Sequence, residues 1–135
     1  MRYLNLKYIY LFIFSLGILS CEKDCSKLVY SDGLTTLNNK LFTGTCKSYY
    51  LTGNLKSVQS YKNGFDNGDW EFYFNNGNIQ TKGSFSKGKK TGIWKYFFEN
   101  GNIWKENFYD VNGSKTGTWK TFSVEGKLID KITFN

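Results

Sequence analysis

A repeat of 24 residues, marked by glycines at two fixed positions, constrains the fold of this chain more than any other feature. Each of the two glycine positions recurs four times, in steps of 24, 24 and 25 residues. The first position holds Gly44, Gly68, Gly92 and Gly117, and the second holds Gly53, Gly77, Gly101 and Gly126. The one extra residue lies between Tyr109 and Gly117, where a loop accommodates it without changing the strand spacings. Such a chain folds as an array of equivalent units.

Each unit is predicted to be one β-hairpin, because aromatic residues stand at fixed places between its glycines. A tryptophan follows the first glycine by two residues, and another aromatic residue comes three residues later. These positions hold Trp70, Trp94 and Trp119, then Tyr73, Phe97 and Phe122, while the first unit has Cys46 and Tyr49 there. Asn76-Gly77 and Asn100-Gly101 predict two-residue type I′ turns between the strands of a hairpin. The 12 Phe and 10 Tyr, without any Pro, also favour β structure.

The predicted fold is therefore all-β, an antiparallel meander of hairpins that forms one elongated, twisted sheet. The units span residues 42–65, 66–89, 90–114 and 115–135 of a domain predicted at 28–135, with a partial N-terminal cap near Leu28–Leu41. A single hairpin is marginally stable in water, so the units must stack to bury their apolar side chains. Periodicity leaves open whether the sheet stays single, forms a sandwich or closes on itself.

The pattern G-x-W-x-x-Y/F-x-x-x-G-x-L/I, followed by a strand that ends in an aromatic residue and a glycine turn, resembles the MORN-repeat variant of bacterial proteins. The resemblance covers residues 42–135, with a weaker extension back to about 27. It implies the same elongated β-meander. Proteins with this repeat include the YwqK-type antitoxins, so the resemblance also implies binding and neutralisation of a toxin.

The first 20 residues are predicted to be a lipoprotein signal peptide. Arg2 and Lys7 precede an apolar run of 12 residues, Tyr8–Leu19, which is shorter than the roughly 20 residues that a membrane-spanning helix needs. The segment Ile18–Cys21 resembles the lipobox of bacterial lipoproteins, which implies acylation of Cys21 and a lipid anchor in the cell envelope. The alternative is an ordinary signal peptide that leaves a free cysteine.

Residues 21–27 are predicted to be a lipidated polar tether. Glu22, Lys23 and Asp24 resemble the signals that send some lipoproteins to the outer face of the outer membrane, although any lipoprotein needs a polar tether. The two remaining cysteines, Cys25 and Cys46, either pair in an oxidising compartment or stay free.

Charge and composition argue against nucleic-acid binding, metal binding and catalysis. Removal of the leader leaves 16 basic and 11 acidic residues, a net charge of +5, with the lysines scattered through every unit. There is no His, the commonest general base and a frequent zinc ligand. The segment Gly88–Gly92 contains Lys and Thr, but it is the turn of a repeat and not a phosphate loop. We therefore expect a non-enzymatic protein without a cofactor.

A partner-binding patch is predicted around Trp104, which breaks the repeat. The equivalent positions of the other units hold Lys56, Gln80 and Ile129, so packing between units does not require a tryptophan there. Alternation along the strands places further aromatic residues on the same face, and an exposed aromatic patch is typical of an interaction site. The candidates are Trp104, Tyr96, Phe98, Phe72 and Phe74. The alternative is that sheet twist buries the aromatic rows and that Trp104 only packs against a neighbour.

The leading function is that of an anchored repeat lipoprotein that presents a β surface to another protein. The toxin-neutralising function implied by the resemblance would, with an exported protein, be immunity against an incoming toxin. Carbohydrate binding by the aromatic rows and a passive structural role in the envelope are alternatives. Contact with anionic lipid is another, through Lys62, Lys87, Lys89, Lys90 and Lys115.

Overall fold

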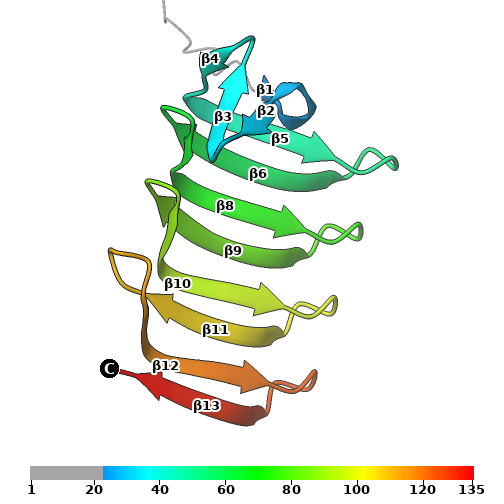
Figure 1. Cartoon of the computed structure of the whole chain (residues 1–135). Helices are drawn as coiled ribbons and strands as arrows, with labels where there is room; N and C mark the ends of the chain where they lie inside the picture. The colour runs from blue at the N-terminus through cyan, green and yellow to red at the C-terminus, as the bar shows by residue number, and fades with distance from the viewer. Residues whose placement is uncertain (1–22) are drawn as a thin grey trace, which may run out of the picture.

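Most of the chain forms one long, mainly antiparallel sheet, described over residues 23–135 of a computed structural model; the leader and Cys21 lie outside the described residues. Figure 1 shows the sheet as a single curved layer in which hairpin follows hairpin in chain order. Its strands are β1 (Lys23–Asp24), β5 (Gly44–Tyr49), β6 (Leu55–Lys62), β7 (Phe65–Asp66), β8 (Gly68–Tyr73), β9 (Ile79–Ser86), β10 (Lys89–Phe97), β11 (Ile103–Tyr109), β12 (Lys115–Phe122) and β13 (Leu128–Phe134). The predicted fold class is confirmed, with the sheet neither doubled nor closed.

The glycine periodicity reflects a backbone requirement, because all eight repeat glycines have positive φ, from 62° at Gly117 to 142° at Gly44. The predicted turn type is wrong, however. In the loop after β8 only Gly77 has positive φ, and its N–H donates to the Phe74 carbonyl at 3.0 Å. Pairs of positive φ, as type I′ turns require, occur instead between hairpins, at Asn63-Gly64 and Lys87-Gly88.

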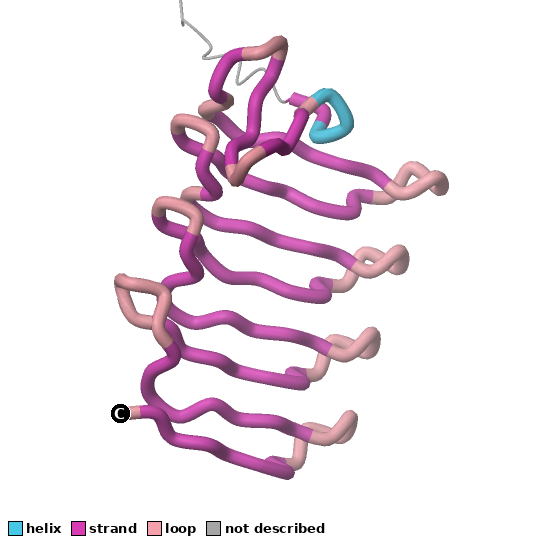
Figure 2. The backbone as a smooth tube through the Cα atoms, in the orientation of Figure 1, coloured by secondary structure: helices cyan, strands magenta, loops and turns pink. Residues whose placement is uncertain are grey.

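Asparagine side chains connect the loops at the ends of successive hairpins. We call residues 50–54, 74–78, 98–102 and 123–127 the tip loops. Figure 2 shows them one after another, at the same end of successive hairpins. The residue after the second repeat glycine is asparagine in three units, and its amide donates to a carbonyl in the next tip loop. These bonds are Asn54 to Asn75 at 2.7 Å, Asn78 to Glu99 at 2.9 Å and Asn102 to Val124 at 2.8 Å. The units are thus joined at their loops as well as along their strands.

The N-terminal end of the sheet is covered by a smaller structure. A three-stranded sheet, formed by β2 (Val29–Ser31), β3 (Leu34–Leu37) and β4 (Lys40–Leu41), lies beside the first hairpin (Figure 1). Before it, β1 pairs in parallel with β5, a short 3-10 helix η1 (Cys25–Lys27) follows, and Cys25 forms a disulfide with Cys46. The folded part therefore includes residues 23–27 of the predicted tether, because strand pairing and the disulfide fix them to the sheet.

Candidate functional site

One side of the sheet, which we call the tryptophan face, carries the side chains of Trp70, Trp94 and Trp119 together with the aromatic residues aligned with them. Residues of alternating position share a face, and the strand register brings aromatic rings on neighbouring strands together. Ring centroids lie 4.9 to 5.7 Å apart in the pairs Phe42–Tyr61, Tyr61–Trp70, Trp70–Phe85, Phe85–Trp94, Tyr109–Trp119 and Trp119–Phe134. This row replaces the core that a second layer would provide.

The three indole rings occupy equivalent places because each ring N–H has the same kind of partner. They donate to the carbonyls of Ser60, Ser84 and Phe108 at 2.8, 3.1 and 2.9 Å. Each of these residues precedes the last aromatic residue of its strand. Trp94 is the most deeply buried of the three, with 3% of its surface exposed. It lies over Gly83, a glycine outside the repeat pattern.

Two of the lysines proposed to contact lipid belong to the aromatic row. The Lys90 Nζ lies 4.2 Å from the Trp94 ring centroid and 3.1 Å from the Tyr96 hydroxyl, and Lys115 Nζ lies 4.8 Å from the Trp119 centroid. Such contacts attract a cation to the face of the ring. The side chains of Lys90 and Lys115 therefore lie over the rings. Of the five lysines proposed to contact anionic lipid, Lys62, Lys87 and Lys89 remain.

Trp104 occupies a β-bulge, and this explains why the residue at its position differs from unit to unit. Tyr96 pairs with Lys105 and Phe97 with Ile103, so Trp104 has no partner on the neighbouring strand. The same register shift recurs in the other hairpins at the positions equivalent to Trp104. Trp104 is 40% exposed, with its ring 6.1 Å from that of Phe98 and the Lys105 Nζ 4.1 Å from its centroid.

A hollow of about 460 Å³ lies beside Trp104 at the tip-loop end of the sheet. The residues lining it include Phe74, Gln80, Tyr96, Phe98, Glu99 and Trp104. The structure thus brings four of the five predicted patch residues together. Phe72 is not among them, because its ring packs 6.0 Å from Trp70 in the row of aromatic side chains. The polar residues Gln80 and Glu99 were not predicted, since a patch was sought among aromatic residues only.

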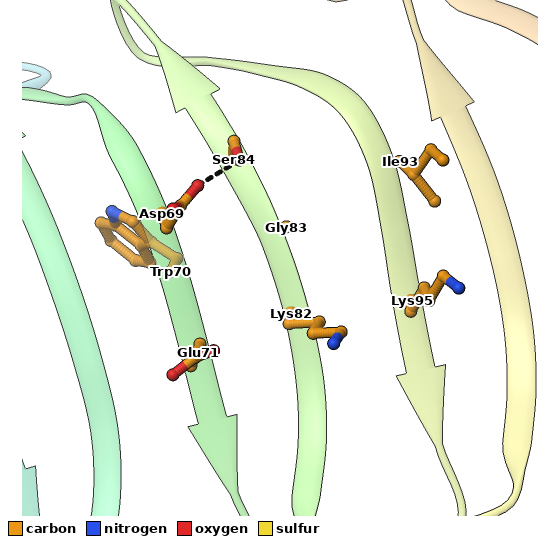
Figure 3. A pocket seen from close by; sticks show the side chains of 8 residues that line it. All are labelled: Asp69, Trp70, Glu71, Lys82, Gly83, Ser84, Ile93 and Lys95. Carbon is orange, nitrogen blue, oxygen red and sulfur yellow. Dashed lines mark hydrogen bonds between the residues drawn. The ribbon is translucent and has the colours of Figure 1, made fainter.

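The opposite side, which we call the charged face, carries acids and lysines in a row across the strands. Figure 3 shows part of it over β8, β9 and β10, where Asp69, Glu71, Lys82 and Lys95 surround a second hollow of about 310 Å³ and Ser84 donates to Asp69. Register places Glu71 opposite Lys82, and Lys95 forms an ion pair with Glu106 at 3.0 Å. Opposite charges on neighbouring strands stabilise a sheet modestly.

The shifted pKa values of this sheet have structural causes. Burial, followed by a hydrogen bond to Glu71, raises the pKa of Tyr73 to about 12. Burial and the nearby Asp66 raise the pKa of Tyr61 to about 12, and burial raises the pKa of Asp66 itself. Both phenols therefore remain protonated at neutral pH and act as packed hydrogen-bond donors.

Two kinds of feature are absent from residues 23–135, a group of metal-binding side chains and a long apolar helix. No group of three or more acidic, Cys or His side chains there is arranged to hold a metal ion. The described chain also has no helix that is long and apolar enough to cross a membrane.

An open array of equivalent hairpins with two different outer faces defines a tandem-repeat protein. The profile of the MORN repeat variant matches three tandem segments, residues 42–63, 66–87 and 90–110. These three hairpins thus carry tandem MORN repeats of the variant type, as the resemblance implied. No curated protein and no solved structure matches it significantly. Such repeats indicate a protein that interacts with proteins or membranes.

Proposed function

We propose that this protein is a non-enzymatic, lipid-anchored envelope protein that binds another protein through the hollow beside Trp104. The observation that carries the proposal is the exposed tryptophan at a bulge, where neither strand pairing nor the repeat requires it. A tryptophan next to a hollow with an aromatic wall and a few polar groups is typical of a binding hot spot. Tyr96 lies in strand β10 and Phe98 in a tip loop of the repeat, so the backbone fixes both side chains of the lining. The hollow is therefore preformed.

The finer proposal is that the bound protein is a toxin. Its support is the resemblance of the repeat to that of YwqK-type antitoxins. A lipid-anchored protein of the outer membrane, facing the periplasm or the outside, would meet an incoming toxin, so the role is immunity at the envelope. The identity of the bound protein separates this proposal from a structural role, since a passive envelope component would bind a resident envelope protein.

The first test replaces Trp104 with glutamine, the residue that the second unit has at the same bulge. Because Gln80 shows that the bulge accepts this side chain, the Trp104→Gln variant is expected to fold as the parent does. We expect it to bind its partner at least about tenfold more weakly, the loss typical of a central aromatic hot spot. The measurement is capture by the full chain from detergent-solubilised envelopes, followed by an affinity titration with the purified captured protein.

Lys56→Gln is the matched control, because Lys56 occupies the same bulge in the first unit and is exposed. This variant should bind as tightly as the parent. Equal binding by all three proteins would contradict the hollow as the binding site. If the Trp104→Gln variant instead loses binding to an immobilised glycan array, the hollow is a carbohydrate site; Gln80 and Glu99, which lie beside its rings, make this the second candidate.

The anchor is tested at Cys21. The Cys25–Cys46 disulfide supports export, because disulfides persist in oxidising compartments. Cells that make the parent should incorporate radiolabelled palmitate into the protein and hold it in the membrane fraction, whereas the Cys21→Ala variant should lose the label. A parent protein without label, or a label that survives in the Cys21→Ala variant, would contradict lipidation at this cysteine.

A further inference from the structure

Strand β13 forms an open edge of the long sheet. It pairs with β12 on one side and with no other strand of the described chain (Figure 1). Three of its apolar residues are about half exposed or more: Leu128 at 46%, Ile129 at 64% and Ile132 at 53%. A long edge strand with exposed apolar side chains is a template for pairing with another strand.

The other edge of the long sheet is covered by the N-terminal segment. There β1 pairs with β5, and the disulfide between Cys25 and Cys46 holds the covering segment in place. A covered edge at one end and an uncovered edge at the other indicate that β13 is the edge available to a partner.

A further hairpin of the same repeat does not fit the β13 edge well. In the first three units an asparagine after the second glycine bonds to the next tip loop, but the fourth unit has Lys127 at this position. Glu125 likewise replaces the asparagine that precedes that glycine in the second and third units. The fourth tip loop thus lacks the groups that connect one unit to the next, and the occupant of this edge is a different kind of strand.

Charge at the edge indicates what such a strand carries. On the charged face Lys131 lies directly opposite Lys120, and no ion pair joins Lys131 to another side chain of residues 23–135. Like charges directly opposite each other are unfavourable, and an acidic residue beside Lys131 would relieve them. On the tryptophan face the edge presents Asp130 and the exposed Ile132.

We propose that β13 binds an extended segment of a partner protein by strand addition, as a new antiparallel edge strand. The segment carries an acidic residue opposite Lys131, a basic residue opposite Asp130 and an apolar residue opposite Ile132. A second copy of this chain is a poorer occupant, because the antiparallel register that overlaps all of β13 places Lys131 opposite its own copy. This surface is separate from the hollow beside Trp104 and does not depend on the function proposed for it.

Two peptides of identical composition test the proposal. The complementary peptide, Val-Thr-Val-Glu-Lys-Val, runs antiparallel to β13 and sets Val opposite Ile132, Glu opposite Lys131 and Lys opposite Asp130. The exchanged peptide, Val-Thr-Val-Lys-Glu-Val, sets Lys opposite Lys131 and Glu opposite Asp130. With N-terminal fluorophores and at low salt, the parent should bind the complementary peptide about tenfold more tightly by fluorescence anisotropy, because two favourable charge pairs become unfavourable. The D130K/K131D variant, which keeps the composition of the chain, should reverse this preference.

Hydrogen exchange locates the binding, since saturation with the complementary peptide should protect amides of β13 and leave the tip loop at 98–102 unchanged. The Trp104→Gln variant should bind both peptides as the parent does, so failure of the hollow and failure of the edge are distinguishable. The proposal is overturned if the parent binds the two peptides equally, if D130K/K131D keeps the parental preference, or if protection appears away from β13. It is also overturned if the parent sediments as a dimer that the D130K/K131D variant disrupts, because a second copy is then the occupant.

Discussion

Replacing Gly83 with alanine is expected to destabilise the protein by about 2 to 3 kcal/mol, the usual cost of forcing extra volume into a packed site. A Cβ atom at Gly83 would lie 2.2 Å from Cδ2 of Trp94, well inside van der Waals contact. The indole cannot move freely, because its N–H is bonded to the Ser84 carbonyl and Phe85 packs against its ring. Glycine is unfavourable within a strand, so alanine at an open strand position would have the opposite effect. Urea unfolding followed by circular dichroism measures the difference.

A double-mutant cycle identifies Trp94 as the cause. Trp94→Ala alone should cost about 3 to 5 kcal/mol, as expected for a buried aromatic residue. In the Trp94→Ala background, Gly83→Ala should cost nothing or stabilise slightly, because the obstructing ring is gone. Asn107→Ala is the control, because Asn107 lies opposite Trp94 on the other neighbouring strand. Asn107 already has a Cβ atom, so alanine at this position adds no atom beside the Trp94 ring. Equal costs of Gly83→Ala in both backgrounds would contradict this explanation.

The sequence allowed the hairpin array to be predicted because its signals are local. Each repeat glycine indicates a positive φ at its own position, and each aromatic residue indicates a strand. Neither signal depends on distant parts of the chain. The type I′ prediction for the tip loops failed where local rules are insufficient. Asn76 and Asn78 both bond to the Glu99 carbonyl of the next unit, and a two-residue turn would not present them in this way. Contacts between units therefore determine the conformation of the tip loops.

The candidate site was predictable in part for the same reason. Trp104 was found as an exception to the repeat, and the structure explains the exception by a bulge. Alternation gives the face on which a side chain lies but not its neighbours along the sheet, so Phe72 was assigned to the patch although it packs on Trp70. Gly83 was missed, yet a glycine inside a strand and off the repeat pattern is itself a signal of close packing.

The first unit shows how this sheet compensates for a missing tryptophan. Cys46 stands where the other units have tryptophan, is completely buried, and is bonded to Cys25. Elsewhere the indole ring and its hydrogen bond hold successive strands together; here a covalent bond holds η1 and β1 against β5 instead. The disulfide is thus the N-terminal counterpart of the aromatic row.

Removing this disulfide is expected to have the second large effect. The Cys25→Ala/Cys46→Ala variant should be less stable by about 3 kcal/mol, the chain-entropy value for a loop of this length, since the two cysteines are 21 residues apart. The loss should be uneven, because β2, β3 and β4 form a separate small sheet, held to the long sheet by this segment and by hydrogen bonds such as that from the Thr35 N–H to the Gly64 carbonyl. Hydrogen exchange should show their amides exchanging faster, while those of β9 to β12 keep most of their protection.

Reduction provides the control, because it breaks the same bond without changing the sequence. Dithiothreitol should destabilise the parent by a similar amount and leave the double alanine variant unaffected. A parent whose stability does not respond to dithiothreitol would mean that the bond contributes nothing. A uniform loss of protection from β5 to β13 would show instead that the N-terminal cap and the hairpins unfold as one unit, and that the disulfide stabilises the whole array rather than its covered edge.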